Sequence, residues 1–407
     1  MTMQGSNRPQ YAKQMMEDRI RVYITLYLIT INPINSLISH YLKLVGIRVG
    51  DLSLILYMGA LAGVAYWILK NGLDVYDFGW LLAAYLFYGI QWLLCKADVR
   101  RYLTQGSILA IYRFYLPTVF FITKNVKNWR ILYTDKLCIR YADMMTILAL
   151  IMKLTSTKAV NRYTYMDFSY SFLPIWGLAV IIALKTKRLG QCILAAMGIL
   201  TCTIYGARGT LLWLLMLVLV LFIFYKAGLP YLNVIGKRIS LLLGLAVIGM
   251  QIVLPIILNS SFAADSYLLQ RLASGEITDS SGRDDISDRC MEALMNMKMT
   301  DYNGLFYDRT FLGGYVHNIV LEALLSFGWI YGSLLLMGLF GYIGYKFMVC
   351  TDEDKLNLVY FTCVLFLRYF ISGSIYLEGN FWIYIGVLMS IKMAPVLLQT
   401  NVRGRKQ

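Results

Sequence analysis

Three basic residues carry the chemistry that this sequence suggests: Arg208, Arg283 and His317. Arg208 stands between two glycines, which allow a ligand to approach the backbone closely. Arg283 follows Gly282 at the start of a predicted helix, where its guanidinium and the free backbone N–H groups face the same way. His317 precedes Asn318, and its imidazole could donate a hydrogen bond to phosphate or exchange a proton. Together these residues predict an anion-binding site.

Each of these residues also has a structural interpretation. A single arginine near a membrane interface usually anchors the chain there by snorkelling. Asp284 and Asp285 could pair with Arg283 and close the anion site. A histidine at the mouth of a helix is often a hydrogen-bonded structural residue. The three residues are nevertheless predicted to lie on one face of the membrane beside the longest loop, which favours a common site.

Further charged residues are secondary candidates. Arg368 falls inside an apolar segment and must find a partner there. Glu322 and Glu378 lie near the outer ends of predicted spans, where each could accept a proton or could simply be a carboxylate favoured by the helix dipole. Arg289 lies on the same predicted helix as Arg283. The seven cysteines include no CxxC spacing, so the sequence predicts neither a metal site nor a cofactor.

Membrane helices are the elements that must position these residues. Of the 407 residues, 58% are hydrophobic and 15% are charged, whereas a soluble domain carries about 25% charged residues. Continuous apolar runs of about 20 residues recur along the chain, which indicates transmembrane helices and excludes a β-barrel. The net charge of +15 is assigned to membrane orientation and anionic lipids, because no soluble fold is present to offer a basic face to nucleic acid.

The predicted fold class is an all-α polytopic integral membrane protein with about 12 transmembrane helices (11–12) in a single transmembrane domain over residues 1–407. The predicted spans are 22–39, 51–69, 78–95, 103–123, 139–152, 168–184, 190–206, 210–225, 239–258, 319–345, 356–375 and 378–398. The fifth span is short and carries Asp143, so it could instead lie in the interface. Residues 259–316 are predicted to form an extracytoplasmic helical cap, with helices near 262–273 and 283–298.

The distribution of lysine and arginine predicts the orientation. Most of them fall in loops that are cytoplasmic if both termini are cytoplasmic. The polar first 21 residues and the apolar run that follows lack a cleavage pattern, so the first span is expected to be retained. The predicted location is the cytoplasmic (inner) membrane, with the cap and the candidate site on the extracytoplasmic face.

Several segments together match the pattern of a known family. They are Gly-Ala-Arg-Gly at 206–209, Gly282-Arg283 in the large outer loop, Tyr315–Leu324 with its His-Asn-x-x-Leu-Glu pattern, and Phe327–Gly332. With these segments the sequence resembles the O-antigen polymerase and ligase superfamily. The segment 165–174 resembles the Wzy-type polymerase branch in particular. The resemblance covers about 160–385, and the earlier half is similar only in hydropathy. The sequence departs from the family in the Ala before Arg208, where Ser is common, and in the two aspartates after Arg283.

The resemblance implies a GT-C-like membrane glycosyltransferase. Such an enzyme polymerises undecaprenyl-pyrophosphate-linked oligosaccharide repeat units into O-antigen, capsular polysaccharide or exopolysaccharide, without a metal and with inversion. The family's functional basic residues fall on Arg208, Arg283 and His317, with Tyr315 and Asn318 expected to contact pyrophosphate or sugar. The implied partners are lipid-linked repeat units, membrane lipids and a chain-length regulator, with no nucleic acid. Two alternatives stay open: ligase-type transfer of a finished glycan to another acceptor, and a lipid-linked oligosaccharide flippase without bond chemistry.

Overall fold

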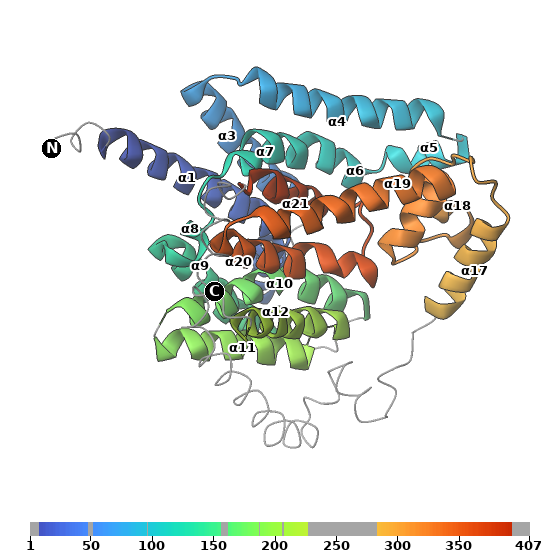
Figure 1. Cartoon of the computed structure of the whole chain (residues 1–407). Helices are drawn as coiled ribbons and strands as arrows, with labels where there is room; N and C mark the ends of the chain where they lie inside the picture. The colour runs from blue at the N-terminus through green and yellow to red at the C-terminus, as the bar shows by residue number, and fades with distance from the viewer. Residues whose placement is uncertain are drawn as a thin grey trace, which may run out of the picture. The chain divides into compact units, whose positions relative to one another are not determined.

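A computed structural model describes residues 8–47, 52–95, 97–155, 162–186, 188–205, 207–226 and 283–392. Within these residues the secondary structure is helical and contains no β-strand, which confirms the all-α prediction (Figure 1). Three helical segments are long and apolar enough to cross a membrane: α3 (Ser53–Asn71), Met166–Lys185 and α19 (Ile319–Val349). The number rises to five if each of two bent helix pairs forms one span. These are the features of a helical membrane protein.

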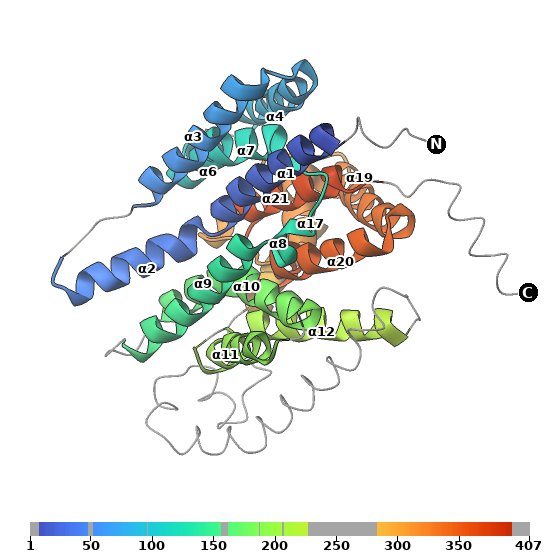
Figure 2. The ribbon, with the colours of Figure 1, turned by 90° about the vertical axis from the view of Figure 1, so that its left-hand side faces the viewer.

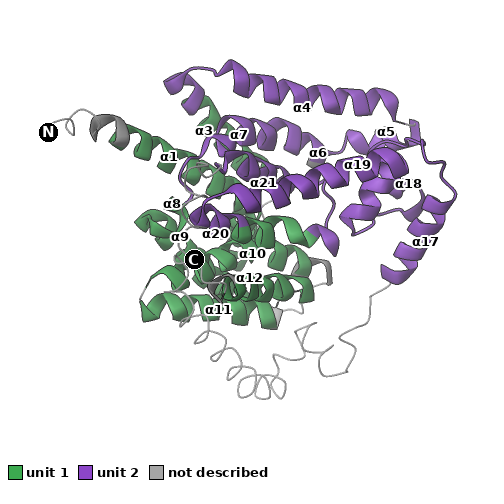
Figure 3. Ribbon diagram, in the orientation of Figure 1, with its two compact units in different colours: residues 1–66, 130–281, 359–368 green, residues 67–129, 282–358, 369–407 purple. Residues whose placement is uncertain are grey.

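The chain divides into two compact units, which Figure 3 shows in different colours. Unit 1 comprises residues 1–66, 130–281 and 359–368, and unit 2 comprises residues 67–129, 282–358 and 369–407. Each unit combines segments that are far apart in the sequence.

Unit 1 is built around α10. Its helices are α1 (Arg8–Ile29), α2 (Ile31–Leu44), the first part of α3, α8 (Ile131–Thr134), α9 (Lys136–Leu154), α10 (Arg162–Lys185), α11 (Leu189–Tyr205), α12 (Arg208–Lys226), the last residues of α20 (Asp352–Phe361) and η5 (Thr362–Phe366). Helix α10 packs against α9, α11 and α12 (Figure 2) and buries Phe172 and Trp176 completely. A Cβ atom on Gly198 would lie 2.9 Å from Cδ1 of Trp176, so this glycine allows α11 to approach α10 closely.

One predicted span in unit 1 is broken. The sequence predicts a continuous helix over 22–39, but α1 ends at Ile29 and α2 begins at Ile31, with a bend of 57° between them. Pro33 explains the break, because it has no N–H to donate to the carbonyl of Ile29 and its ring would clash with that carbonyl. The hydroxyl of Thr30 donates to the carbonyl of Leu26 at the bend.

Unit 2 contains two groups of helices. The first is α4 (Val75–Leu94), α5 (Ala97–Leu103), α6 (Gly106–Ala110), the π-helix η1 (Ile111–Tyr115), α7 (Leu116–Phe121), η2 (Thr123–Asn125) and α21 (Gly379–Ser390). The second is α17 (Arg283–Met295), α18 (Asp308–Leu312) and α19, with α17 and α18 both packed against α19. Helix α21 packs against η1, α7 and η2, where a Cβ on Gly386 would meet Val119 at 2.9 Å.

Most of the predicted spans that fall on described residues coincide with helices. This holds for 51–69, 78–95, 139–152, 168–184, 190–206, 210–225 and 319–345, with ends that differ by a few residues. The span 103–123 is instead divided among α5, α6, η1 and α7, and Pro117 accounts for the π-helix because it cannot donate to the carbonyl of Arg113. In the predicted span 356–375 the helical structure ends at Phe370, and in the predicted span 378–398 it ends at Ser390. The span 239–258 and the cap helix near 262–273 lie outside the described residues.

Candidate functional site

The predicted second cap helix is present as α17, which begins at Arg283. Asp284 and Asp285 occupy its first turn, where the helix dipole favours negative charge. The indole N–H of Trp329 donates to the carbonyl of Leu294 over 3.0 Å and attaches the far end of α17 to α19. The guanidinium of Arg289 donates to the carbonyl of Phe311, which attaches α17 to the end of α18. Arg289 therefore connects two helices of unit 2.

Arg283 lies close enough to His317 to interact with it electrostatically. Burial, together with the positive charge of Arg283, lowers the pKa of His317 from its usual 6.5 to about 4. The imidazole is therefore neutral at pH 7. Its ring lies 4.1 Å from the ring of Tyr315, and its Nδ1 is buried without a hydrogen-bond partner among the described residues. Most buried polar atoms in proteins are hydrogen-bonded, so this nitrogen is an exception.

Asn318 begins α19. Its side-chain oxygen accepts hydrogen bonds from the backbone N–H groups of Val320, at 2.9 Å, and Leu321, at 3.3 Å. This is the geometry of an N-cap, for which asparagine is among the preferred residues. The side-chain oxygen of Asn318 therefore stabilises the start of α19 next to His317. The contact of Asn318 with a substrate stays a prediction.

Sequence reasoning missed the charged pair Asp308–Arg309. Both side chains are buried, with 1% and 5% of their surface exposed, and Nη1 of Arg309 lies 3.3 Å from Oδ1 of Asp308. The guanidinium lies over the ring of Phe306 at 4.5 Å and 5.9 Å from the ring of Tyr315. Its Nη2 is buried and has no hydrogen-bond partner among the described residues. The available signal was a charged pair inside the otherwise apolar stretch 305–312 of the predicted cap.

Tyr315 links the two basic groups of this cluster. Its ring lies 4.1 Å from the ring of His317 and 5.9 Å from the guanidinium of Arg309. The carboxylate of Asp308 accepts a hydrogen bond from the backbone N–H of Val316 over 3.1 Å, which holds the segment between the two groups. Burial raises the pKa of Asp308, although the charge of Arg309 acts in the opposite direction. We call Arg283, Asp308, Arg309, Tyr315 and His317 the cationic cluster.

The backbone of this segment is strained at both ends. Phe306 and His317 have φ values of 69° and 59°, and they are the non-glycine residues with positive φ in the described chain. Such conformations cost about 1–3 kcal/mol each and are retained where the surrounding structure imposes them, often at functional sites. Asp308, Arg309 and Tyr315 lie between these two strained residues in the chain.

Glu322 lies in the first turn of α19, and 1% of its surface is exposed. Its carboxylate accepts hydrogen bonds from the hydroxyl of Ser374 and, over 3.1 Å, from the backbone N–H of Ile375. It is also near enough to Asp308 and Arg309 to interact with both electrostatically. Glu378 precedes α21, and its side chain approaches Gly373 closely, where φ is 88°. Both predicted carboxylates therefore lie in unit 2, and Glu322 borders the cationic cluster.

Helix α19 is broken within the apolar run. Gly328 has φ 74° and ψ 177°, which are not helical values. The break removes helical donors from nearby carbonyl groups, and the chain at 303–304 replaces them: the N–H groups of Asn303 and Gly304 donate to the carbonyl of Ser326, at 3.1 and 2.9 Å. A broken apolar helix whose backbone groups are satisfied by protein is typical of binding sites in membrane proteins.

Arg208 and Arg368 lie in unit 1, whereas Arg283 and His317 lie in unit 2, so the proximity of Arg208 to the other two predicted residues stays a prediction. Arg208 is half-buried at the start of α12 and follows Ala207, whose N–H donates to the hydroxyl of Ser169 over 3.1 Å. The guanidinium of Arg368 lies 4.5 Å from the ring of Tyr170. Ala207 and Arg368 therefore both contact residues 169–170 of α10.

Comparison of the chain with protein-family models, with curated proteins and with solved structures gives no match. Within the described residues no group of three or more His, Cys, Asp and Glu side chains is placed to hold a metal ion. The functional interpretation of the site therefore rests on its own geometry and charge.

Proposed function

We propose that this protein is a membrane glycosyltransferase that polymerises undecaprenyl-pyrophosphate-linked oligosaccharide repeat units. The proposal includes the finer features that the resemblance implies: a GT-C-like fold with about 12 spans, both termini in the cytoplasm and a site on the outer face of the cytoplasmic membrane. Two guanidinium groups, Arg283 and Arg309, would bind the diphosphate that leaves the donor sugar. Arg208 is proposed as a further phosphate-binding residue.

The observation that carries the proposal is the pair of unsatisfied nitrogens in the cationic cluster. Nη2 of Arg309 and Nδ1 of His317 are buried, belong to side chains that both lie near the ring of Tyr315, and have no hydrogen-bond partner among the described residues. Leaving a buried polar group unsatisfied costs about 1–3 kcal/mol, and more for a charged group. An anionic ligand would satisfy Nη2 of Arg309 and would add negative charge beside Arg283 and Arg309, whereas a sugar hydroxyl would donate its hydrogen bond to Nδ1 of His317.

The reaction is a nucleophilic substitution at the anomeric carbon. A sugar hydroxyl of the acceptor repeat forms the new C–O bond, and the bond between the anomeric carbon and the phosphate oxygen breaks, with its electron pair going to the diphosphate. Arginines already directed at those oxygens stabilise the developing charge and lower the barrier. Attack from the opposite side inverts the anomeric configuration.

The hydroxyl proton needs an acceptor in the same site. We assign this role to His317, because its ring is neutral at pH 7 and its Nδ1 has no hydrogen-bond partner among the described residues. Both oxygens of Glu322 already accept hydrogen bonds from the 374–375 segment, so this carboxylate is assigned to positioning that segment against α19. Glu378 is not needed for the proton transfer in this scheme.

The test is a reconstitution of the purified full chain in proteoliposomes. A lipid-linked repeat unit is supplied on the outer side, and the length of the lipid-linked glycan is followed by gel electrophoresis. Growth of the glycan by whole repeat units supports the proposal. Transfer of a finished glycan to a different acceptor without growth would indicate the ligase alternative, and movement of the lipid-linked unit across the bilayer without growth would indicate a flippase.

A further inference from the structure

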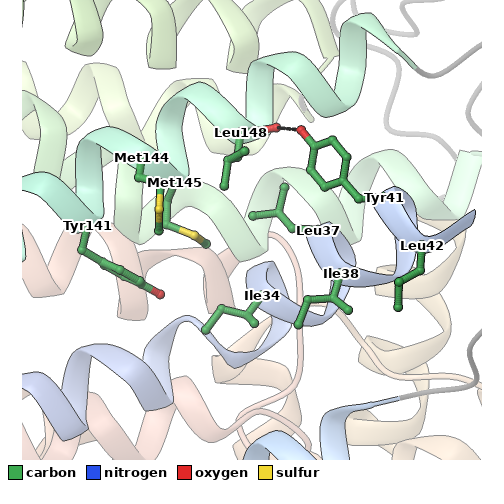
Figure 4. Close-up of a pocket in the computed structure, with 9 residues that line it drawn as sticks. All are labelled: Ile34, Leu37, Ile38, Tyr41, Leu42, Tyr141, Met144, Met145 and Leu148. Carbon is green, nitrogen blue, oxygen red and sulfur yellow. Dashed lines mark hydrogen bonds between the residues drawn. The ribbon is translucent and has the colours of Figure 1, made fainter. Parts of the chain in front are cut away.

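Unit 1 contains an apolar groove that the proposed reaction does not use. The groove has a volume of about 400 Å³ and runs between α2 and α9 (Figure 4). Ile34, Leu37 and Ile38 line it from α2, and Met144, Met145 and Leu148 line it from α9. Its size falls within the range of about 300–1,000 Å³ that is usual for small-molecule sites.

The two tyrosines of the groove expose their rings and not their hydroxyls. The hydroxyl of Tyr41 donates to the backbone carbonyl of Leu148 over 3.2 Å, as the dashed line in Figure 4 marks. The hydroxyl of Tyr141 is 2.6 Å from that of Thr30. Since both polar groups are satisfied within the protein, the groove presents a hydrocarbon surface. Such a surface binds an alkyl chain in preference to a polar ligand.

One end of the groove is cationic. The hydrogen bond between Thr30 and Tyr141 joins the first part of α2 to the first part of α9. The hydrogen bond between His40 and Thr155 joins the last part of α2 to the end of α9, so the two helices run parallel. Lys43 lies in the last turn of α2 and Lys153 in the last turn of α9. Both ammonium groups are close enough to His40 to interact with it electrostatically.

This end of the groove suits a negatively charged group. Lys43 is exposed, and α2 contains no Asp or Glu. The ammonium of Lys153 lies 4.2 Å from the centre of the Phe168 ring. A phosphodiester carries one negative charge, which two lysine side chains at the same end of the groove attract.

We propose that the α2–α9 groove binds an anionic glycerophospholipid of the bilayer. One acyl chain would occupy the groove, and the phosphodiester would lie beside Lys43 and Lys153. Helix α2 belongs to one of the bent helix pairs that could span a membrane, which places an alkyl-lined groove where acyl chains are available. This lipid site is independent of the proposed glycosyl transfer.

Photo-crosslinking of the full-length protein in nanodiscs tests the proposal. The probe is phosphatidylglycerol with a diazirine in one acyl chain, and the comparisons are phosphatidylcholine with the same chains and a diazirine-labelled polyprenyl diphosphate. Peptide mapping should place the phosphatidylglycerol label within 34–42 and 141–148. Equal labelling of these segments by phosphatidylcholine, or preferential labelling by the polyprenyl diphosphate, would overturn the proposal.

Two matched pairs of variants localise the effect. Met144→Trp should fill the groove and remove most of the label, whereas Ile147→Trp, on an exposed face of the same helix outside the groove lining, should retain it. Lys43→Gln should lower phosphatidylglycerol labelling by about fivefold, whereas Lys136→Gln, at the opposite end of α9, should leave it unchanged. Undiminished labelling of both Met144→Trp and Lys43→Gln would contradict the assignment.

Discussion

Arg283 lies close enough to His317 to interact with it electrostatically, although 34 positions of chain separate 283 from 317. Burial and the adjacent guanidinium together lower the pKa of the imidazole to about 4. The pairing depends on two helix starts, because Arg283 opens α17 and His317 directly precedes the N-cap of α19. An imidazole held neutral beside a permanent cation is suited to an anionic substrate whose reaction also releases a proton.

Removing the charge of Arg283 should raise the pKa of His317. In Arg283→Gln only the burial contribution remains, so the pKa should move from about 4 towards, but not up to, its usual 6.5. NMR of histidine-labelled protein measures this directly, because the chain contains only two histidines and His40→Gln assigns the signals. Lys298→Gln is the matched control on an exposed site, and a pKa unchanged in Arg283→Gln would contradict the pairing.

The depressed pKa of His317 should also make the folded state sensitive to acid. An unfolded histidine titrates near 6.5 and the folded one near 4, so the unfolded state binds the proton first as the pH falls. Stability should therefore decrease between pH 6.5 and pH 4, and above pH 6.5 His317 should contribute no pH dependence. His317→Gln should show a smaller loss of thermal stability over the same interval, and equal losses in the two proteins would argue against a buried neutral imidazole.

The break in α19 should require glycine. A Cβ on Gly328 would collide with the backbone carbonyl of Asp301, and φ is 74°, so Gly328→Ala should cost about 1–3 kcal/mol or more of stability. Gly338→Ala is the matched control, since its Cβ would meet nothing within 4 Å and it should stabilise the helix by up to about 1 kcal/mol. Chemical denaturation in detergent measures both, and a continuous helix would make the two variants behave alike.

The buried pair Asp308–Arg309 should be energetically coupled. Asp308→Asn leaves the guanidinium buried without its counter-charge, which costs about 3–5 kcal/mol. The double variant Asp308→Asn/Arg309→Met removes both charges and should recover part of this loss, as a double-mutant cycle measures. Strictly additive losses would indicate that the two side chains do not interact.

Loss of a phosphate-binding arginine should reduce the rate more than the stability. Arg283→Ala removes a charge that stabilises the leaving diphosphate, so it should lower the rate of glycan extension about 10²–10³-fold. Arg309→Lys should lower the rate by a similar factor, because a lysine is a point charge that cannot form a bidentate bond with phosphate oxygens. Arg208→Ala should have an effect of similar size. Lys298→Gln should extend glycan at the normal rate. Variants of all three arginines that work at full speed would remove them from the mechanism.

The start of α17 could be predicted because its signal is local. Ser281 or Gly282 can cap a helix, Asp284 and Asp285 favour a helix start, and apolar residues follow at helical spacing. The break between α1 and α2 also has a local signal in Pro33, but a hydropathy window averages over one proline and merges the two helices. Helix existence was therefore easier to predict than helix continuity.

Arg309 and Gly328 could not be predicted in the same way. The apolar residues around Asp308 and Arg309 are a weak signal of burial, but the burial of the guanidinium depends on Phe306, Tyr315 and packing against α19. Gly328 lies in a continuous apolar run, and its non-helical backbone depends on the 301–304 segment that packs against it. In both cases the deciding contacts are tertiary.

The pKa of His317 in the presence of undecaprenyl diphosphate tests the central claim most directly. If the diphosphate binds the cationic cluster, its negative charge should raise the pKa of His317 from about 4, and Arg309→Gln should weaken this response. The NMR titration of histidine-labelled protein gives both values in one experiment. A pKa that stays near 4 at saturating diphosphate would contradict the account.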